Sequence, residues 1–248
     1  MFHDTWALTG RLMKQILRSP DTIITVAVTP IAIFLLFRYV FGGAIATGGA
    51  NYTNYLLPGI LLITVGSSVA YTALRIYNDT SGGITARLQT MPISRSAVLW
   101  SHVLTSLVSN AVTAVLIVGV GFAMGFRPEA DLLGWLAAIG VLTLFTLTLT
   151  WMSVIPGLTA TSMEGAGAFS YPLIFLPFLS SAFAPTESMP GPVRWFAENQ
   201  PVTSVVETLR ALFEDEPVGN DIWIALAWIV GIGVLCYVLA LRTYRKAV

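Results

Sequence analysis

Charged residues are scarce in this sequence. Asp, Glu, Lys and Arg make up only 10% of its 248 residues, whereas 55% are hydrophobic and the mean hydropathy is +0.76. A soluble domain carries about 25% charged residues, and its surface helices keep one polar face. Here, apolar runs of 18 or more residues, long enough to cross roughly 30 Å of hydrocarbon, recur along the whole chain. We therefore expect an all-α integral membrane protein with a single transmembrane domain over residues 1–248.

Residues suited to catalysis or to nucleotide binding are also scarce. The single cysteine, Cys236, excludes an intrachain disulfide. The two histidines, His3 and His102, cannot supply the three or four ligands of a zinc site, and we expect His102 to be an ordinary interfacial side chain. The two lysines, Lys14 and Lys246, do not follow glycine, so there is no phosphate-binding P-loop, and no Gly-x-Ser-x-Gly elbow occurs. We expect no metal site, no bound cofactor and no enzymatic activity in this chain.

The apolar runs predict six transmembrane helices, at residues 22–41, 55–75, 97–125, 132–154, 166–184 and 221–241. If both termini are cytoplasmic, nine of the thirteen basic residues lie in the inner segments, and nine of the thirteen acidic residues lie outside. Cytoplasmic loops carry an excess of Lys and Arg, so this distribution predicts cytoplasmic termini. No acidic residue lies at mid-depth in these spans, which argues against a transporter coupled to protons or sodium ions.

The first twenty residues have the pattern of a helix that lies along a membrane surface. Leu8, Leu12 and Ile16 fall on one helical face, and Arg11 and Lys14 fall on the opposite face. Such a helix places its cations toward anionic headgroups at the inner interface. The alternative is an extended first span.

A second amphipathic segment lies in the long outer region 185–220. Pro201 opens it, and an apolar stripe follows at helical spacing, formed by Val202, Val205, Val206, Leu209, Leu212 and Phe213. At about twelve residues it is too short to span a bilayer. We expect an outer re-entrant or interfacial helix marked by Pro201, Ser204, Glu207 and Arg210, and an ordinary surface helix is the alternative.

A polar segment, residues 78–96 (NDTSGGITARLQTMPISRS), separates the second predicted span from the third. The Gly82-Gly83 pair is expected to release the chain from the second span, and Pro92 is expected to end a short helix. A rigid polar segment of this kind indicates a cytoplasmic handle on which a partner outside the bilayer acts. The alternative is a solvated loop that only sets topology.

The order of these elements resembles the permease subunit of ABC-2-type exporters, especially the daunorubicin-resistance-like group of multidrug and lipid exporters. The segment 87–95 (RLQTMPISR) is similar to that group's loop between spans two and three. Further along, the spaced positions of the family signature are matched by Leu173, Leu176, Leu179, Ser180, Ala182, Met189, Pro190, Pro201, Ser204 and Arg210, whereas Val202 departs from it. The resemblance covers nearly the whole chain.

The resemblance implies a specific set of partners. Two permeases, identical or paralogous, form the translocation path, and two separate cytoplasmic ATPase subunits bind ATP and Mg. Residues 79–91 are then a coupling helix that enters a groove of the ATPase, and the N-terminal helix and residues 155–165 complete that contact. The candidate coupling residues are Asp79, Thr85, Arg87, Leu88, Met91, Arg95 and Glu164.

The expected cargo is hydrophobic or amphiphilic, such as a drug, an antibiotic or a lipid, because the predicted path has no fixed charge. Candidate path residues are Thr64, Ser67 and Ser68 in the second span and Phe169, Tyr171 and Phe175 in the fifth, and packing is the alternative role for each. The resemblance implies the bacterial inner (plasma) membrane as the location. The rival classes are a stand-alone secondary transporter without an ATPase partner and a membrane-embedded enzyme.

Overall fold

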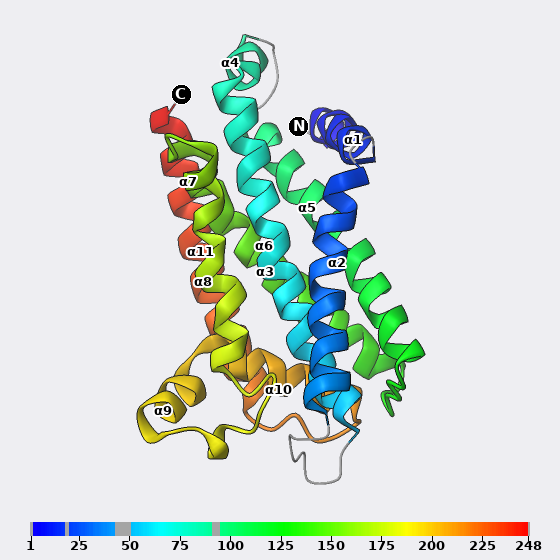
Figure 1. The fold of residues 1–248 in the computed structure, drawn as a ribbon. Helices are drawn as coiled ribbons and strands as arrows, with labels where there is room; N and C mark the ends of the chain where they lie inside the picture. The colour runs from blue at the N-terminus through cyan, green and yellow to red at the C-terminus, as the bar shows by residue number, and fades with distance from the viewer. Residues whose placement is uncertain (1, 18–19, 43–50, 91–94, 248) are drawn as a thin grey trace.

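The computed structural model describes residues 2–17, 20–42, 51–90 and 95–247, and every regular element within these ranges is a helix. In chain order the α-helices are α1 (Phe2–Leu17), α2 (Pro20–Leu36), α3 (Tyr52–Ser81), α4 (Ile84–Gln89), α5 (Arg95–Ala123), α6 (Leu132–Thr159), α7 (Met163–Ala168), α8 (Ser170–Phe175), α9 (Gly191–Asn199), α10 (Pro201–Phe213) and α11 (Asp221–Ala247). The long helices form one bundle, with α1 and α4 at one end and α9 and α10 at the other (Figure 1). We call these the α4 end and the α10 end.

Four of the described helices are long and apolar enough to cross a membrane: Tyr52–Ser81, Ser96–Ala123, Leu132–Thr159 and Asp221–Tyr244. They contain nearly all of the predicted second, third, fourth and sixth spans. The predicted first span corresponds to α2 and a π-helical turn, Phe37–Phe41, which together include a shorter apolar helix, Ala27–Phe41.

The predicted fifth span, 166–184, is divided into short helices. The chain passes from α7 through α8 into a 3₁₀ helix, Leu176–Leu179. Pro172 and Pro177 interrupt the backbone hydrogen-bond ladder here, because proline has no N–H to donate. The broken segment lies close against α3, where a Cβ atom on Gly66 would stand only 3.1 Å from the carbonyl oxygen of Leu173. The single helix predicted over 166–184 is therefore not present.

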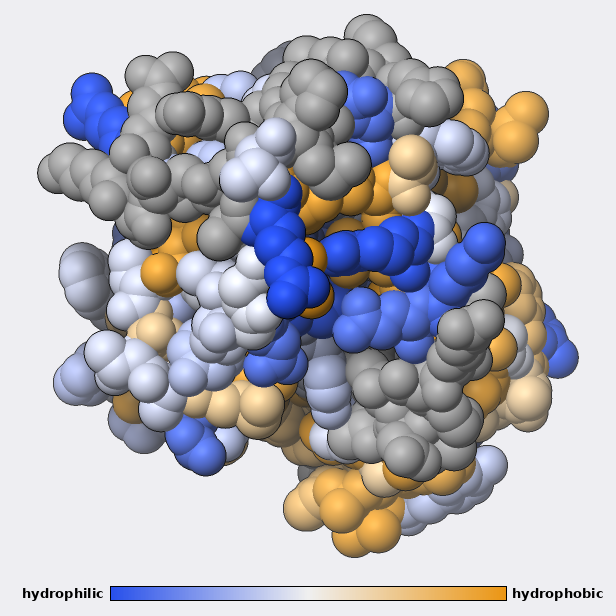
Figure 2. Space-filling model, turned by 90° about the horizontal axis from the view of Figure 1, so that it is seen from above, coloured by the Kyte–Doolittle hydropathy of each residue, from blue (hydrophilic) through white to orange (hydrophobic). Residues whose placement is uncertain are grey.

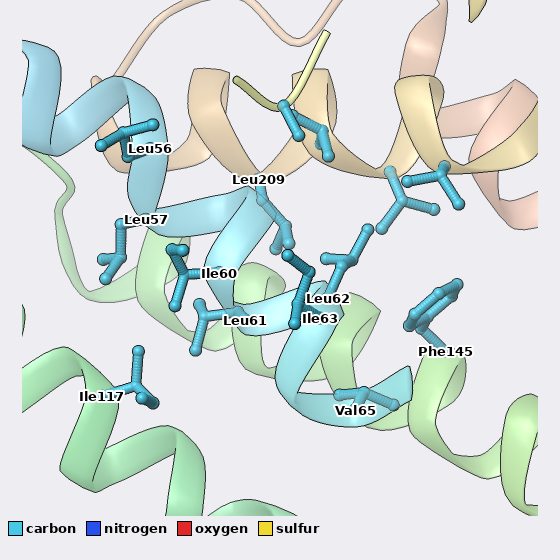
Figure 3. Close-up of a cluster of buried hydrophobic side chains, with 14 of the residues drawn as sticks. Leu56, Leu57, Ile60, Leu61, Leu62, Ile63, Val65, Ile117, Phe145 and Leu209 are labelled. Atoms are coloured by element: carbon cyan, nitrogen blue, oxygen red, sulfur yellow. The ribbon is translucent and has the colours of Figure 1, made fainter. Parts of the chain in front are cut away.

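The centre of the bundle is α3, which packs against α2, α5, α6, α8 and α10. Its buried side chains, among them Leu56, Leu57, Ile60 and Ile63, form the middle of the main hydrophobic cluster (Figure 3). By contrast, α5, α6 and α11 keep broad exposed apolar faces. Outward-facing apolar residues around a buried helix are the arrangement expected of a bundle surrounded by lipid.

Both amphipathic helices of the sequence analysis are present. Helix α1 lies across the bundle at the α4 end and buries Leu12, while Lys14 remains exposed (Figure 1). Helix α10 lies crosswise at the other end and buries Val205, Val206 and Leu209 against α3, α6 and α11. A further short helix, α9, was not anticipated; it precedes α10 and is largely exposed.

Candidate functional site

Helix α4 stands at the tip of the bundle, directly after α3 (Figure 1). Helix α3 ends at Ser81, and the N–H of Gly82 donates to the Asn78 carbonyl at 2.9 Å. Gly83 has φ +72°, a left-handed conformation that glycine adopts without steric cost, and α4 begins at the next residue. The glycine pair therefore releases the chain from α3, as the sequence predicts.

The short helix is smaller than the expected 79–91. It spans Ile84–Gln89, and residues 79–81 still belong to α3, because the first break in the helical backbone occurs at Gly82. Pro92 and Met91 lie outside the described residues. Arg95 begins α5, and its side chain also lies outside the description.

The side chains of α4 divide into an inner set and an outer set. Thr85 is buried, with its hydroxyl 3.5 Å from that of Thr80. Arg87 is exposed and Leu88 is half-buried. Viewed from the α4 end, hydrophilic side chains gather near the middle of the molecule (Figure 2). Of the candidate coupling residues on this helix, Arg87 and Leu88 are thus the ones whose side chains are at least partly exposed.

Asp79 is placed differently from the expectation that it faces a partner. Its side chain is buried, and its Oδ2 atom lies 2.6 Å from Nη2 of Arg11 and 3.5 Å from Nε2 of His102. The carboxylate therefore joins α1, α3 and α5. His102 is fully enclosed in this cluster and is not the ordinary interfacial side chain that the sequence suggested. The sequence also did not predict that Arg11 pairs with Asp79. The one available signal was the acid at position 79, near the end of α3, whose other charged residue is Arg75.

A row of polar side chains continues from this cluster into the bundle. Arg75 donates to the hydroxyl of Thr72 at 2.9 Å, and Thr72 donates to that of Ser106 at 3.1 Å. The Ser106 hydroxyl is also 3.2 Å from that of Thr150, so the row joins α3, α5 and α6. Farther along, Ser68 donates to Oδ1 of Asn110 at 2.6 Å. Buried polar groups in a membrane domain need such partners.

The candidate path residues on α3 face the interior of the bundle. Thr64 is buried and donates to the Ile60 carbonyl of its own helix at 2.7 Å. Ser68 is buried in the polar row, and Ser67 is half-buried. Thr64 and Ser68 thus form hydrogen bonds inside the described chain, whereas Ser67 is only half-buried.

The candidate path residues of the broken segment have two different environments. Tyr171 and Phe175 on α8 are 62% and 61% exposed, whereas Phe169 packs against the main hydrophobic cluster. Exposed apolar residues also lie at the end of α2 and in the π-helical turn after it, including Leu36 and Tyr39. Helices α2 and α8 both pack against the central helix α3.

Glu164 lies in the first turn of α7, where its side chain is exposed. Ser162 caps this helix by accepting from the N–H of Gly165 at 3.0 Å. The preceding loop is short, because α6 continues to Thr159 instead of ending near residue 154. Helix α7 lies near the α4 end beside α3 and α6, so α1, α4 and α7 share that end of the molecule (Figure 1).

At the α10 end, Arg210 is the most extensively bound of the candidate residues. Its guanidinium lies 3.7 Å from the centre of the Tyr55 ring and donates to Glu207 at 2.7 Å. It also donates to the carbonyls of Ser181 at 3.0 Å and Tyr55 at 3.3 Å. Pro201 occupies the first turn of α10, and Ser204 is buried. Arg210 thus ties α10 to the beginning of α3 and to Ser181, near the end of the broken segment.

Within the described ranges, no group of three His, Cys, Asp or Glu side chains is arranged to hold a metal ion.

Comparison with known proteins identifies the family. The ABC-2 type transporter family matches residues 3–213. A daunorubicin resistance ABC transporter permease of Streptomyces coeruleorubidus is 27% identical, over 95% of this chain and 84% of its own length. A probable doxorubicin resistance ABC transporter permease of Mycobacterium tuberculosis is 27% identical, over 96% of this chain and 87% of its own length. A putative transport permease of Porphyra purpurea is 27% identical, over 84% of this chain and 73% of its own length. The match begins in α1 and ends in α10, so it includes α1, α4 and α7, and the chain belongs to the ABC-2 type transporter family.

Proposed function

We propose that this chain is the permease subunit of an ATP-driven exporter, and that two separate ATPase subunits dock at the α4 end. The observation that carries the proposal is α4 itself: a short helix, released from α3 by a left-handed glycine, that presents an exposed Arg87 and a half-buried Leu88. Arginine is one of the residue types enriched among those that dominate the binding energy of protein interfaces. The permeases that this chain resembles support the same role.

The proposed orientation places the α4 end in the cytoplasm and the α10 end outside. The charge distribution of the sequence supports it, since cytoplasmic segments of membrane proteins are rich in Lys and Arg. In this arrangement α2 and the broken segment are the first and fifth of six spans. Helix α1 lies in the inner interface, and α10 lies in the outer interface or re-enters the bilayer. The membrane is the bacterial plasma membrane.

Movement of α4 would reach the membrane domain through α3. Closure of the ATPase subunits on ATP and Mg, which they bind themselves, would displace α4. Helix α3 is the most buried candidate span, and the carboxylate of Asp79 joins it to α1 and α5 two residues before it ends. The first three spans would then rotate as a unit against the last three. Buried, hydrogen-bonded contacts transmit such a displacement because they do not deform continuously.

The proposed translocation path lies between two permeases, which are identical or paralogous. The exposed aromatic rings of Tyr171 and Phe175 on α8 support a contact or path on that face. An apolar, aromatic path without fixed charge suits hydrophobic or amphiphilic cargo, including drugs, antibiotics and lipids. Thr64 and Ser68 belong to the packing of each protomer in this scheme.

The test is the double variant Arg87→Ala/Leu88→Ala in the complex reconstituted with its ATPase. We expect ATPase binding at least tenfold weaker and the loss of transport-coupled ATP hydrolysis, because both anchors are removed. Arg194→Ala is the matched control, since Arg194 is an exposed arginine near α9 at the opposite end. Unchanged assembly and coupling in the double variant would refute the docking site. Transport by permease vesicles that lack any ATPase would instead favour a secondary transporter.

A further inference from the structure

A cavity of about 560 Å³ lies between α3, α5, α6 and α10, away from the helices of the α4 end. Val65, Ala114, Ala138 and Leu209 contribute one wall from each of these helices. Val115 and Ile139, which also line it, are 71% and 56% exposed. The cavity is therefore open to the side, along the seam between α5 and α6.

The length of the cavity matches one leaflet of a bilayer. Along α5 its lining extends from Leu107 to Val118, which is about 17 Å at 1.5 Å per residue. Half of a hydrocarbon core of roughly 30 Å is about 15 Å. Asn110 lies near the deep end, at the middle of α5, and Trp135 and Phe213 close the α10 end with their ring centroids 5.3 Å apart. The cavity thus covers the leaflet on the α10 side.

The width of the cavity selects a slender occupant. The space open to the centres of water-sized spheres is about 560 Å³ over about 17 Å, or about 6–7 Å across, and a sphere radius of about 1.4 Å on each side widens the cavity to about 9–10 Å. An α-helix with its side chains is about 10–12 Å wide, so a helix from a second copy does not fit inside. A single hydrocarbon chain does.

The buried polar side chains that line the cavity do not need water or a polar ligand as a hydrogen-bond partner. Its buried polar groups already have partners: Asn110 donates to the Ser106 carbonyl at 2.9 Å and accepts from Ser68, and Thr146 donates to the Leu142 carbonyl at 2.7 Å. The remaining lining is almost entirely apolar. Because α5 and α6 are candidate spans, the medium outside the open seam is hydrocarbon, and an empty cavity would forfeit dispersion contacts on its walls.

We propose that this cavity binds one acyl chain of a phospholipid from the leaflet at the α10 end. The methyl end of the chain lies toward Asn110, and the headgroup lies near Trp135, an aromatic residue of the kind that marks the headgroup level. The bound chain touches α3, α5, α6 and α10 together, so it supports the crosswise position of α10. The proposal depends on the membrane placement of these helices and is independent of the ATPase partner.

The test uses the full-length permease in nanodiscs that contain phosphatidylcholine with a photoreactive group on one acyl chain. After illumination, peptide mapping is expected to find label concentrated on residues 107–118 and 135–146. Ala114→Phe, which fills the cavity, is expected to reduce this label at least fivefold. Val234→Phe on the exposed face of α11 is the matched control and is expected to leave it unchanged. If Ala114→Phe fails to fold, Ala111→Leu fills the same cavity with a smaller side chain.

Three results would overturn the proposal. If the exposed face of α11 is labelled as strongly as the cavity, the label comes from ordinary annular lipid. Labelling that is unchanged in Ala114→Phe or Ala111→Leu has the same meaning. A second copy over the seam is tested with Val115→Cys in a Cys236→Ala background, treated with a flexible bismaleimide. We expect no cross-linked pair of permeases through this position, and its formation would show that protein covers the cavity.

Discussion

Arg11 on α1 and Asp79 on α3 form an ion pair in which Nη2 and Oδ2 are 2.6 Å apart. His102 of α5 approaches the same oxygen at 3.5 Å. One carboxylate thus joins a crosswise helix to two helices of the bundle, immediately before α3 gives way to α4. The stability of the α4 end should depend on this contact.

Asp79→Asn is expected to destabilise the folded permease. The change removes a buried negative charge that Arg11, His102 and the neighbouring Arg75 surround. Loss of one partner of a buried pair costs several kcal/mol, but Arg11 is 40% exposed and partly solvated, so we expect about 1–3 kcal/mol. Thermal unfolding in detergent measures it. Arg194→Ala, which breaks an exposed i,i+4 pair, should leave the midpoint unchanged; an equal effect of both changes would contradict the prediction.

Arg210→Lys is expected to loosen α10 nearly as much as Arg210→Ala. A lysine ammonium cannot stack flat on the Tyr55 ring and also reach the Ser181 and Tyr55 carbonyls as the guanidinium does. Loss of about 2 kcal/mol of local stability corresponds to roughly 30-fold faster amide exchange in α10. Hydrogen–deuterium exchange of residues 201–213 measures this. If Arg210→Lys keeps the amide-exchange protection of the unaltered protein, the positive charge alone is enough to hold α10 in place.

Gly83→Val is expected to reduce coupling, whereas Gly83→Asn should retain most of it. A Cβ at Gly83 meets no atom within 4 Å, so the effect comes from the left-handed backbone alone. Asparagine tolerates that conformation and a β-branched residue does not, with a penalty of about 1–2 kcal/mol or more. The measurement is ATP hydrolysis stimulated by the reconstituted permease. Equal stimulation by both variants would show that the direction of α4 does not depend on this turn.

Stability should rise on mild acidification because of Glu214, which lies outside the candidate spans. Burial, together with the charges of Glu216, Glu129 and Glu207, raises the pKa of Glu214, although Arg210 opposes them. The proton is then held more tightly in the folded chain. Its stabilising contribution is complete below the unfolded pKa of roughly 4.3 and is lost as pH rises through the raised folded value.

Glu214→Gln tests this dependence directly. The variant is expected to melt at a higher temperature than the unaltered protein near pH 7, and the difference should vanish near pH 4. Asp215→Asn is the matched control, because Asp215 is exposed and has φ 53°, which asparagine also adopts. A control with the same pH profile as Glu214→Gln would point to the net charge of the loop instead of the buried carboxyl.

Much of the architecture was predictable because it depends on local patterns. The helical spacing of apolar residues predicted α1 and α10, and Gly82-Gly83 predicted the turn before α4. Each of these features involves residues within a few turns of one another. Local backbone chemistry is therefore enough to predict them.

The choice of central helix could not be read from hydropathy. Helix α3 has the lowest mean hydropathy of the four candidate spans and is the most buried, whereas α11 has the highest and is the least buried. In a bilayer the outward faces must be apolar, so polar side chains collect on the helix that other helices cover. For the same reason Ser68 and Thr64, expected along a path, lie inside the bundle.

The Asp79 cluster required the tertiary structure. Arg11 is 68 residues from its partner in the sequence, and no periodic pattern connects the two positions. The polar character of residues 78–96 predicted a partner-facing segment, but the helical register of α3 turns Asp79 inward while Arg87 points out. Only the packing of α1 across the bundle, which brings Arg11 to Asp79, shows that this carboxylate is buried instead of facing a partner.

The hydrogen-bonded pairs between α3 and α5 repeat once per helical turn. Ser68 and Thr72 are one helical turn apart on α3, and their partners, Asn110 and Ser106, are one turn apart on the antiparallel α5. A slide of about 5.4 Å would bring Ser68 beside Ser106 and engage a new pair, whereas a slide of half that distance would leave hydroxyls unpaired in hydrocarbon. Any sliding of α3 along α5 would therefore favour whole-turn steps.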